Sequence, residues 1–413
     1  MKKQITGYSI LFLLLGSGAL TQFMMAIAAL AMARLYDPEL FGELGLYAGL
    51  GSLVAVFSGL RYDHIAFSQT AHRKHSLFFV SFLVCFIVPI FAALVFSILA
   101  LYLFKDKYSI NWAIIFCYSY SIFYLATQYL IAIGRYRTFS LLRFVQVVIL
   151  IAIGVGSTEL VGDIGLLLAY SVSQFVIGAF VVVFYFTNFT KNNIRHATLL
   201  AGRFYRIARI NSLVVVLQYS TSFAPILMGY VLYDKSEMGA YYLFAQIFSA
   251  PLAIFRRSFL NFLNVEFPSP KHALMLLENK EKLTKILSIL IVVSICLLIG
   301  IGEFSQEITV IVFGVEWGKY SYLLLPLFVF FLLDAFLQPF TTLLTLWACG
   351  GKAFGYEIVR FLVVFIALPV IVKFQDISFF YFFIMYSFVM IAIYVCILLS
   401  VIYSVILVGR NSL

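Results

Sequence analysis

The stretch LLLPLFVFFLLDAFLQPFTTLLTLW, residues 323–347, decides the class of fold. It carries a single charged side chain, Asp334, in an otherwise apolar run. An apolar helix of about 20 residues crosses the hydrocarbon core of a bilayer, so this run predicts a transmembrane helix. A strand of a membrane β-barrel would be about 10 residues long and would alternate in polarity, which this run does not.

The whole chain shares this composition. Of its 413 residues 63% are hydrophobic and 11% are charged, whereas a soluble protein carries about 25% charged residues. The sequence therefore predicts a polytopic membrane protein. The five cysteines are scattered along the chain without a metal-binding spacing, so we expect small core residues, and we expect no cofactor and no metal.

Twelve apolar segments are long enough to span a membrane. They are residues 8–33, 44–66, 77–104, 109–133, 139–157, 164–187, 210–233, 238–262, 284–302, 320–347, 353–373 and 377–407. The first runs about 25 residues, beyond the roughly 7–15 of a signal-peptide core, so we expect it to be retained. The predicted fold is all-α, with twelve transmembrane helices.

The basic residues orient these helices. Basic residues toward the ends of spans, Arg360 among them, are counted with the adjoining loops. With twelve spans, 21 of the 28 Lys and Arg residues then lie on the side of the two termini and 6 on the opposite side, and Arg61 is left uncounted. Positive charge collects on the cytoplasmic side, so both termini are expected in the cytoplasm. The net charge of +10 then reflects topology and contact with anionic membrane lipids, and we expect no nucleic-acid partner.

The chain divides into two halves of six spans. The basic connection after span six separates an N-terminal lobe, residues 1–195, from a C-terminal lobe, residues 196–413. Both halves start on the same side, so the repeats run parallel, which is one of the plans of transporters. We expect the two lobes to flank a central cavity.

Asp334 lies near the middle of the tenth span. Intramembrane ionisable residues are rare and usually functional. One interpretation is a gate or a carboxylate that couples transport to protons or sodium. The alternative is a buried carboxyl that bonds a neighbouring helix.

Polar amides in other spans permit two interpretations. Gln22 lies in span one, and Asn211 and Gln218 share one face of span seven. These side chains either line a substrate cavity or hydrogen-bond between helices.

Arg61 stands in SGLRYDHIAF, residues 58–67, at the cytoplasmic end of span two. Its long side chain could simply snorkel to the surface. Arg256 and Arg257 lie near the end of span eight, the equivalent helix of the second half, at a similar depth. Paired arginine sites would suit a dianionic ligand that enters from the cytoplasm. If the helix continues, Asp63 does not face Arg61 and would not neutralise it.

Signatures of several enzyme classes are missing. The sequence has no GxxxxGK[ST], HExxH or GxSxG motif, and the predicted outside loops are short. We therefore expect a protein that is not an enzyme.

Two segments carry a resemblance to a known family. ARLYDPELFGELGLYAGLGSLVAVFSGLRYDHIAFSQTAHR, residues 33–73, resembles the O-antigen flippases called Wzx, within the multidrug/oligosaccharidyl-lipid/polysaccharide superfamily. The segment LYDKSEMGAYYLFAQIFSAPLAIF resembles its second-half counterpart. The matching positions are Arg34, Pro38, Phe41, Gly42, Arg61, Tyr62, Asp63, Ala66, Gly239, Tyr241 and Pro251.

The resemblance implies a flippase of the bacterial inner membrane. Such a protein moves an undecaprenyl-diphosphate-linked oligosaccharide, an O-antigen or similar repeat unit, to the outer face by alternating access. Its cationic cavity maps onto Arg61 and, through the repeat, onto Arg256 and Arg257. A polymerase and chain-length proteins of the same pathway would be partners. The alternatives are a small-molecule exporter of the same superfamily and an O-antigen polymerase or ligase.

Overall fold

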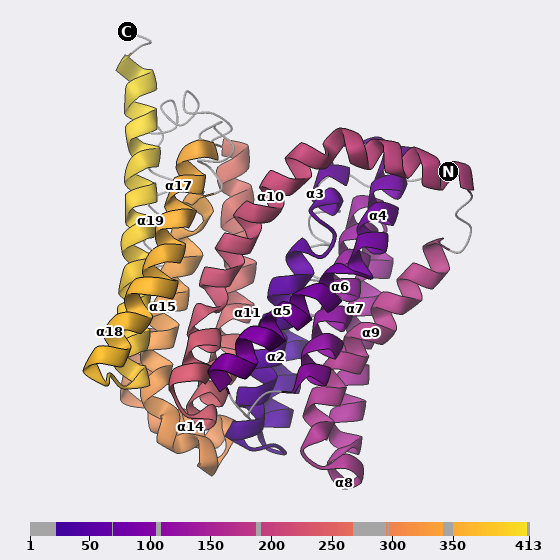
Figure 1. The fold of residues 1–413 in the computed structure, drawn as a ribbon. Coiled ribbons are helices and arrows are strands. Elements are labelled where there is room, and N and C mark those ends of the chain that lie inside the picture. Colours follow the sequence, from indigo (N-terminus) through magenta and orange to yellow (C-terminus); the bar gives the residue numbers. More distant parts are fainter. Residues whose placement is uncertain are drawn as a thin grey trace. The chain divides into compact units, whose positions relative to one another are not determined.

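A computed structural model describes residues 22–67, 69–104, 109–186, 191–266, 295, 297–341 and 350–410. Throughout these ranges the regular elements are helices joined by turns (Figure 1). The expected all-α membrane fold is confirmed.

Ten helices within the described ranges are long and apolar enough to cross a membrane. They coincide one to one with ten of the twelve expected spans. The other two, residues 8–33 and 284–302, lie mostly outside the described residues, although 22–33 and 297–303 are helical. Large apolar side chains such as Phe180 and Phe388 are exposed on these helices, as expected where lipid replaces water.

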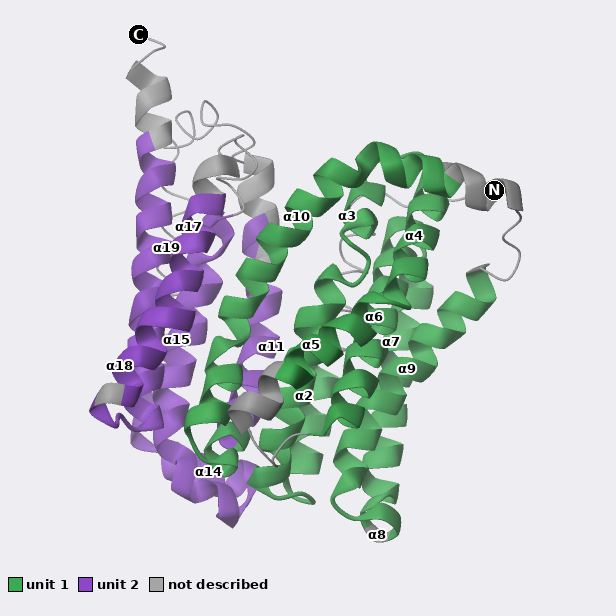
Figure 2. Cartoon of the chain, in the orientation of Figure 1, with its two compact units in different colours: residues 1–239 green, residues 240–413 purple. Residues whose placement is uncertain are grey.

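The chain forms two compact units, residues 1–239 and 240–413 (Figure 2). The first holds α2 (Pro38–Phe57), α3 (Tyr62–Ala66), α4 (Ala71–Cys85), α5 (Val88–Phe104), α6 (Ile110–Ala132), α7 (Tyr136–Gly156), α8 (Thr158–Val161), α9 (Ile164–Phe186), α10 (Lys191–Leu232) and the first turn of α11 (Lys235–Glu266). The second holds the rest of α11, α14 (Ser305–Phe313), η2 (Val315–Leu323), α15 (Leu324–Leu337), α17 (Gly350–Leu362), η3 (Val363–Ala367), α18 (Leu368–Gln375) and α19 (Phe379–Arg410). Packing thus groups α10 with the first unit, while the lobe boundary at residue 195 follows the span count and stays a prediction.

Helix α6 lies at the centre of unit 1. It packs against α2, α4, α5, α7 and α9. Leu125, Ala126 and Tyr129 of α6 are buried in a core that also contains Leu77 and Phe78 of α4. This core fixes the positions of α3 and of the turn before it.

Helix α10 is 42 residues long and includes the connection that the sequence placed before span seven. Its first half crosses the ends of α3 and α4 (Figure 1). Ala197, Leu200 and Ala208 are buried there, and the Tyr62 hydroxyl donates to the Ala201 carbonyl at 3.1 Å. The apolar side of this basic segment therefore packs on protein, and the connection is ordered as helix.

Two similar segments meet where α2 and α11 begin. YDPELFG, residues 36–42, and YDKSEMG, residues 233–239, share Tyr, Asp and Gly at equivalent positions. A Cβ on Gly42 would collide with the backbone carbonyl of Lys235, and a Cβ on Gly239 with that of Pro38. The contact is reciprocal, as in an isologous interface, and only glycine permits it at either position.

Ion pairs flank this contact. The Lys235 ammonium lies 2.6 Å from Glu43 and 3.6 Å from Glu39. Pro38 begins α2 and Glu39 occupies its first turn, where a proline and an acid both favour a helix N-terminus. The charges and the glycines thus hold the two helix starts together within unit 1.

Unit 2 has a core of aromatic rings. Tyr241 of α11 makes edge contacts with Phe379 and Phe383 of α19, and Phe330 of α15 packs against Phe383 and Tyr386. Helices α17, η3 and α18 form one continuous helical run with a π-helical segment in the middle. Helices α11, α15, α17 and α19 together position the polar residues of this unit.

Candidate functional site

The turn between α2 and α3 holds Arg61. Helix α2 ends at Phe57, and both Leu60 and Arg61 have left-handed backbone conformations, with φ of 46° and 59°. Each such residue costs about 1–2 kcal/mol unless it is glycine, so the surrounding packing must hold the turn. The expected helix over residues 44–66 is therefore wrong at its end, because the chain turns before Arg61.

This turn brings Arg61 to two polar neighbours. Its guanidinium donates to the Tyr124 hydroxyl of α6 at 3.1 Å, and the Tyr124 hydroxyl in turn hydrogen-bonds the Asp63 carboxylate. Asp63 is 1% exposed. Burial raises the pKa of this carboxyl, which lies between two candidate spans, and the Arg61 charge opposes the rise. The premise of a continuous helix is wrong, because the chain turns at Leu60 and Arg61, and Arg61 and Asp63 are linked through Tyr124.

The Arg61 cluster, comprising Arg61, Asp63 and Tyr124, is incompletely bonded within the described part of unit 1. The buried Arg61 Nε and Asp63 Oδ1 atoms have no hydrogen-bond partner there. Arg61 as a residue is half-buried. The cluster thus holds the arginine in place and leaves part of its hydrogen-bonding capacity unused.

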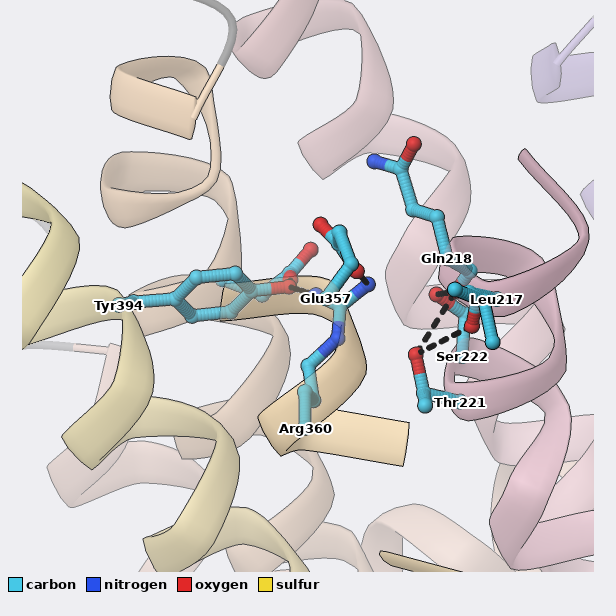
Figure 3. Close-up of polar contacts among 8 residues, drawn as sticks. Leu217, Gln218, Thr221, Ser222, Glu357, Arg360 and Tyr394 are labelled. Carbon is cyan, nitrogen blue, oxygen red and sulfur yellow. Dashed lines mark hydrogen bonds and ion pairs between the residues drawn. The ribbon is translucent and has the colours of Figure 1, made fainter. Parts of the chain in front are cut away.

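A second cluster lies in unit 2. Arg256 Nη1 of α11 is 3.1 Å from Asp334 Oδ2 of α15, and the Tyr394 hydroxyl of α19 donates to Asp334 Oδ1 at 2.9 Å. Arg360 Nη1 of α17 donates to the Tyr394 hydroxyl at 3.5 Å, and Arg360 is ion-paired with Glu357 one turn earlier. Figure 3 shows Arg360 extended between Glu357 and the Tyr394 ring. We call these five residues the Asp334 network.

The network changes three expectations. Asp334 has partners that the sequence did not reveal, which agrees with the interpretation as a carboxyl bonded to neighbouring helices. Arg256 is engaged by that carboxylate. Arg360, counted among the cytoplasmic residues, is instead 1% exposed inside a candidate span. The side chain of Arg257 lies outside the described residues.

The three predicted amides are all placed in unit 1. Gln22 opens the first described helix, and Asn211 and Gln218 lie on α10, each half-buried. The backbone carbonyl of Gln218 accepts hydrogen bonds from the hydroxyls of Thr221 at 2.8 Å and Ser222 at 3.1 Å. The Gln218 side chain points away from both hydroxyls (Figure 3), so its amide is directed off its own helical turn.

Sequence reasoning missed Tyr124, Tyr394, Glu357 and Arg360. The chain has 26 tyrosines, and nothing in the sequence distinguishes Tyr124 and Tyr394 from the others. Glu357 and Arg360 did give one, since they are an acid and a base three positions apart in a predicted span, the spacing that places two side chains on one helix face.

Both clusters combine an arginine, an aspartate and a tyrosine hydroxyl. A guanidinium presents a planar fork of donors that matches phosphate oxygens bidentately. Across the described residues no group of three or more His, Cys, Asp or Glu side chains could hold a metal ion. The arrangement is therefore suited to anion binding by arginine.

Comparisons with known proteins identify the fold. No family model matches this sequence, and no curated protein sequence matches it. Among solved structures, a multidrug resistance MATE family transporter of the MOP superfamily is similar in its inward-facing form, with a TM-score of 0.56 and 14% identity over 99% of this chain and 98% of that one. Its outward-facing form gives 0.56 and 14% over 96% and 95%.

A third similar structure is a MOP superfamily transporter from Pyrococcus furiosus Vc1. Its TM-score is 0.50, with 13% identity over 96% of this chain and 94% of that one, and it is described as having a binding pocket of reverse polarity that suggests a different function. At these identities the similarity establishes the two-lobed, all-helical MATE-type fold for this chain.

Proposed function

We propose that this protein is a flippase that moves an undecaprenyl-diphosphate-linked oligosaccharide from the cytoplasmic to the outer face of the bacterial inner membrane. The fold supports a multi-pass transporter working by alternating access. The substrate class rests on the Arg61 cluster, where a half-buried arginine is fixed in a left-handed turn and has hydrogen-bonding capacity that the cluster does not use. A diphosphate supplies the paired oxygens that such a donor binds best.

The Asp334 network adds a second arginine in the other compact unit. Arg256 is 39% exposed, so a ligand can reach it. The lipid tail would stay in the bilayer while the diphosphate and sugars pass through the protein. Gln22, Asn211 and Gln218 would offer hydrogen bonds to the sugars.

A small-molecule exporter is the second candidate, because two of the similar structures are forms of a multidrug transporter. Cationic drugs should prefer acidic sites, whereas the described part of each unit presents an arginine. A direct comparison separates the two functions. Proteoliposomes should flip a labelled prenyl-diphosphate-linked oligosaccharide under the flippase hypothesis, and should instead export a cationic dye under the alternative.

The residue-level test is substitution of Arg61. In cells that depend on this protein, Arg61→Gln should abolish surface polysaccharide while the protein remains at its normal level in the membrane. Arg61→Lys should retain only part of the activity, because an ammonium keeps the charge but loses the bidentate contact. Arg206→Gln, which removes one charge from an exposed position on α10, should behave as wild type. Full activity of Arg61→Gln would refute the assigned role.

A further inference from the structure

Arg256 and Asp334 differ in their exposure. The Arg256 side chain is 39% exposed and the Asp334 side chain 13%. The guanidinium therefore lies at the open side of the pair and the carboxylate at the recessed side. An incoming anion meets Arg256 first, and it competes with Asp334 for the same guanidinium.

Asp334 would keep other interactions if Arg256 turned away. The Tyr394 hydroxyl would still donate to Oδ1, and Arg360 would still donate to that hydroxyl from behind. Glu357 remains paired with Arg360. The carboxylate thus keeps a hydrogen-bond donor that does not depend on Arg256. A released Arg256 would have no acceptor among the residues of the Asp334 network.

The Asp334 network pairs two guanidinium groups, of Arg256 and Arg360, with two carboxyl groups, of Asp334 and Glu357. With all four groups ionised, the network is neutral. Binding of phosphate by Arg256 therefore replaces one anion by another at the guanidinium. A diphosphate that offers two oxygens to the fork makes a stronger contact than the single nitrogen–oxygen contact seen here.

We propose that Asp334 is an internal competitor of the substrate, and that Arg256 exchanges the Asp334 carboxylate for a phosphate group of the lipid-linked substrate. This inference rests on the proposed function and deepens it. The competitor lowers the affinity for the diphosphate and allows the carboxylate to reclaim Arg256 when the substrate leaves. Asp334 then governs substrate release without touching the substrate, and is a positioning residue.

The test is binding of farnesyl diphosphate to the purified full-length protein in nanodiscs, measured by calorimetry. Asp334→Asn should tighten binding by about three- to tenfold, the range expected when one charged competitor is removed. Arg256→Gln should weaken binding. The double variant should match Arg256→Gln, because the competitor matters only through Arg256. Glu303→Gln removes a negative charge from an exposed position in the same unit and should leave the affinity unchanged.

Other outcomes overturn the inference. Unchanged or weaker binding by Asp334→Asn, with a normal unfolding transition, would refute competition. Tightening that persists in the Arg256→Gln background, or that Glu303→Gln reproduces, would show a general charge effect. If binding depends on Arg61 but not on Arg256 or Asp334, only this inference fails. If the wild type binds no farnesyl diphosphate, the proposed function and this inference fall together.

The same variant separates competition from ion coupling. A coupling carboxylate predicts that Asp334→Asn binds farnesyl diphosphate as wild type does and loses transport that is driven by an ion gradient. A competitor predicts tighter binding and slower release in single-turnover flipping, with or without a gradient.

Discussion

Replacing Gly239 with alanine should destabilise unit 1 at the contact between α2 and the first turn of α11. The new Cβ would fall well inside 3.0 Å of the Pro38 carbonyl oxygen, a separation that real Cβ atoms essentially never show, whereas ordinary contact begins near 3.4 Å. The obstacle is backbone, so no rotamer change relieves it, and the two helix starts must move apart. Overpacking of this kind costs about 1–3 kcal/mol. The move would also stretch the 2.6 Å contact between Lys235 and Glu43.

The assay is denaturant unfolding of the purified protein, followed by tryptophan fluorescence. Gly202→Ala is the matched control, because Gly202 lies in the interior of α10 and a Cβ there meets nothing within 4 Å. Both variants gain about 1 kcal/mol of helix propensity. The packing penalty therefore appears as the difference between them, with Gly239→Ala less stable by about 1–3 kcal/mol. Equal stabilities would refute the close contact at Gly239, and with it the reciprocal packing of residues 36–42 against residues 233–239.

Three further predictions concern the Arg61 cluster and the Lys235 ion pairs of unit 1. Tyr124→Phe removes the hydroxyl shared by Arg61 and Asp63 and should cost about 1–3 kcal/mol in the same unfolding assay; an unchanged midpoint would contradict the shared bond. Burial raises the pKa of Asp63 in the folded protein above its unfolded value of about 3.9. The folded protein therefore binds this proton more tightly than the unfolded chain does. The resulting stability is present at low pH and is lost as the pH rises through the folded-state pKa. Asp63→Asn should flatten this slope in midpoints measured from pH 4 to 8, and an undiminished slope would assign it to another group. Lys235→Gln breaks partly exposed ion pairs and should lower the free energy of unfolding by less than about 1 kcal/mol. A larger decrease would indicate that the ion pairs stabilise the contact between α2 and α11 more than the close packing at the glycines does.

Apolar length alone predicted ten spans correctly because lipid demands a continuous helix of fixed length. It could not predict the end of α2. The two left-handed positions, Leu60 and Arg61, are neither glycine nor proline, and the turn depends on tertiary contacts such as that with Tyr124. The same limit applies to Asp334. Its partner Arg256 lies 78 positions away, and local periodicity carries no information about such pairs. Comparison of the two halves nevertheless predicted Arg256 as a site residue, because it lies in span eight at a depth similar to that of Arg61 in span two. The internal repeat thus identified a residue that the local sequence pattern does not.

The meeting of Gly42 with Gly239 also sets an order of events during synthesis. Gly239 follows Gly42 by 197 positions (239 against 42), which at 5–20 residues per second is about 10–40 s of translation. During that interval α2 can enter the membrane, but the turn that closes against its first residues does not yet exist. Unit 1 can be completed only when the ribosome has begun the helix that continues into unit 2. A pause in translation just before residue 233 would therefore hold the nascent chain with the start of α2 uncovered.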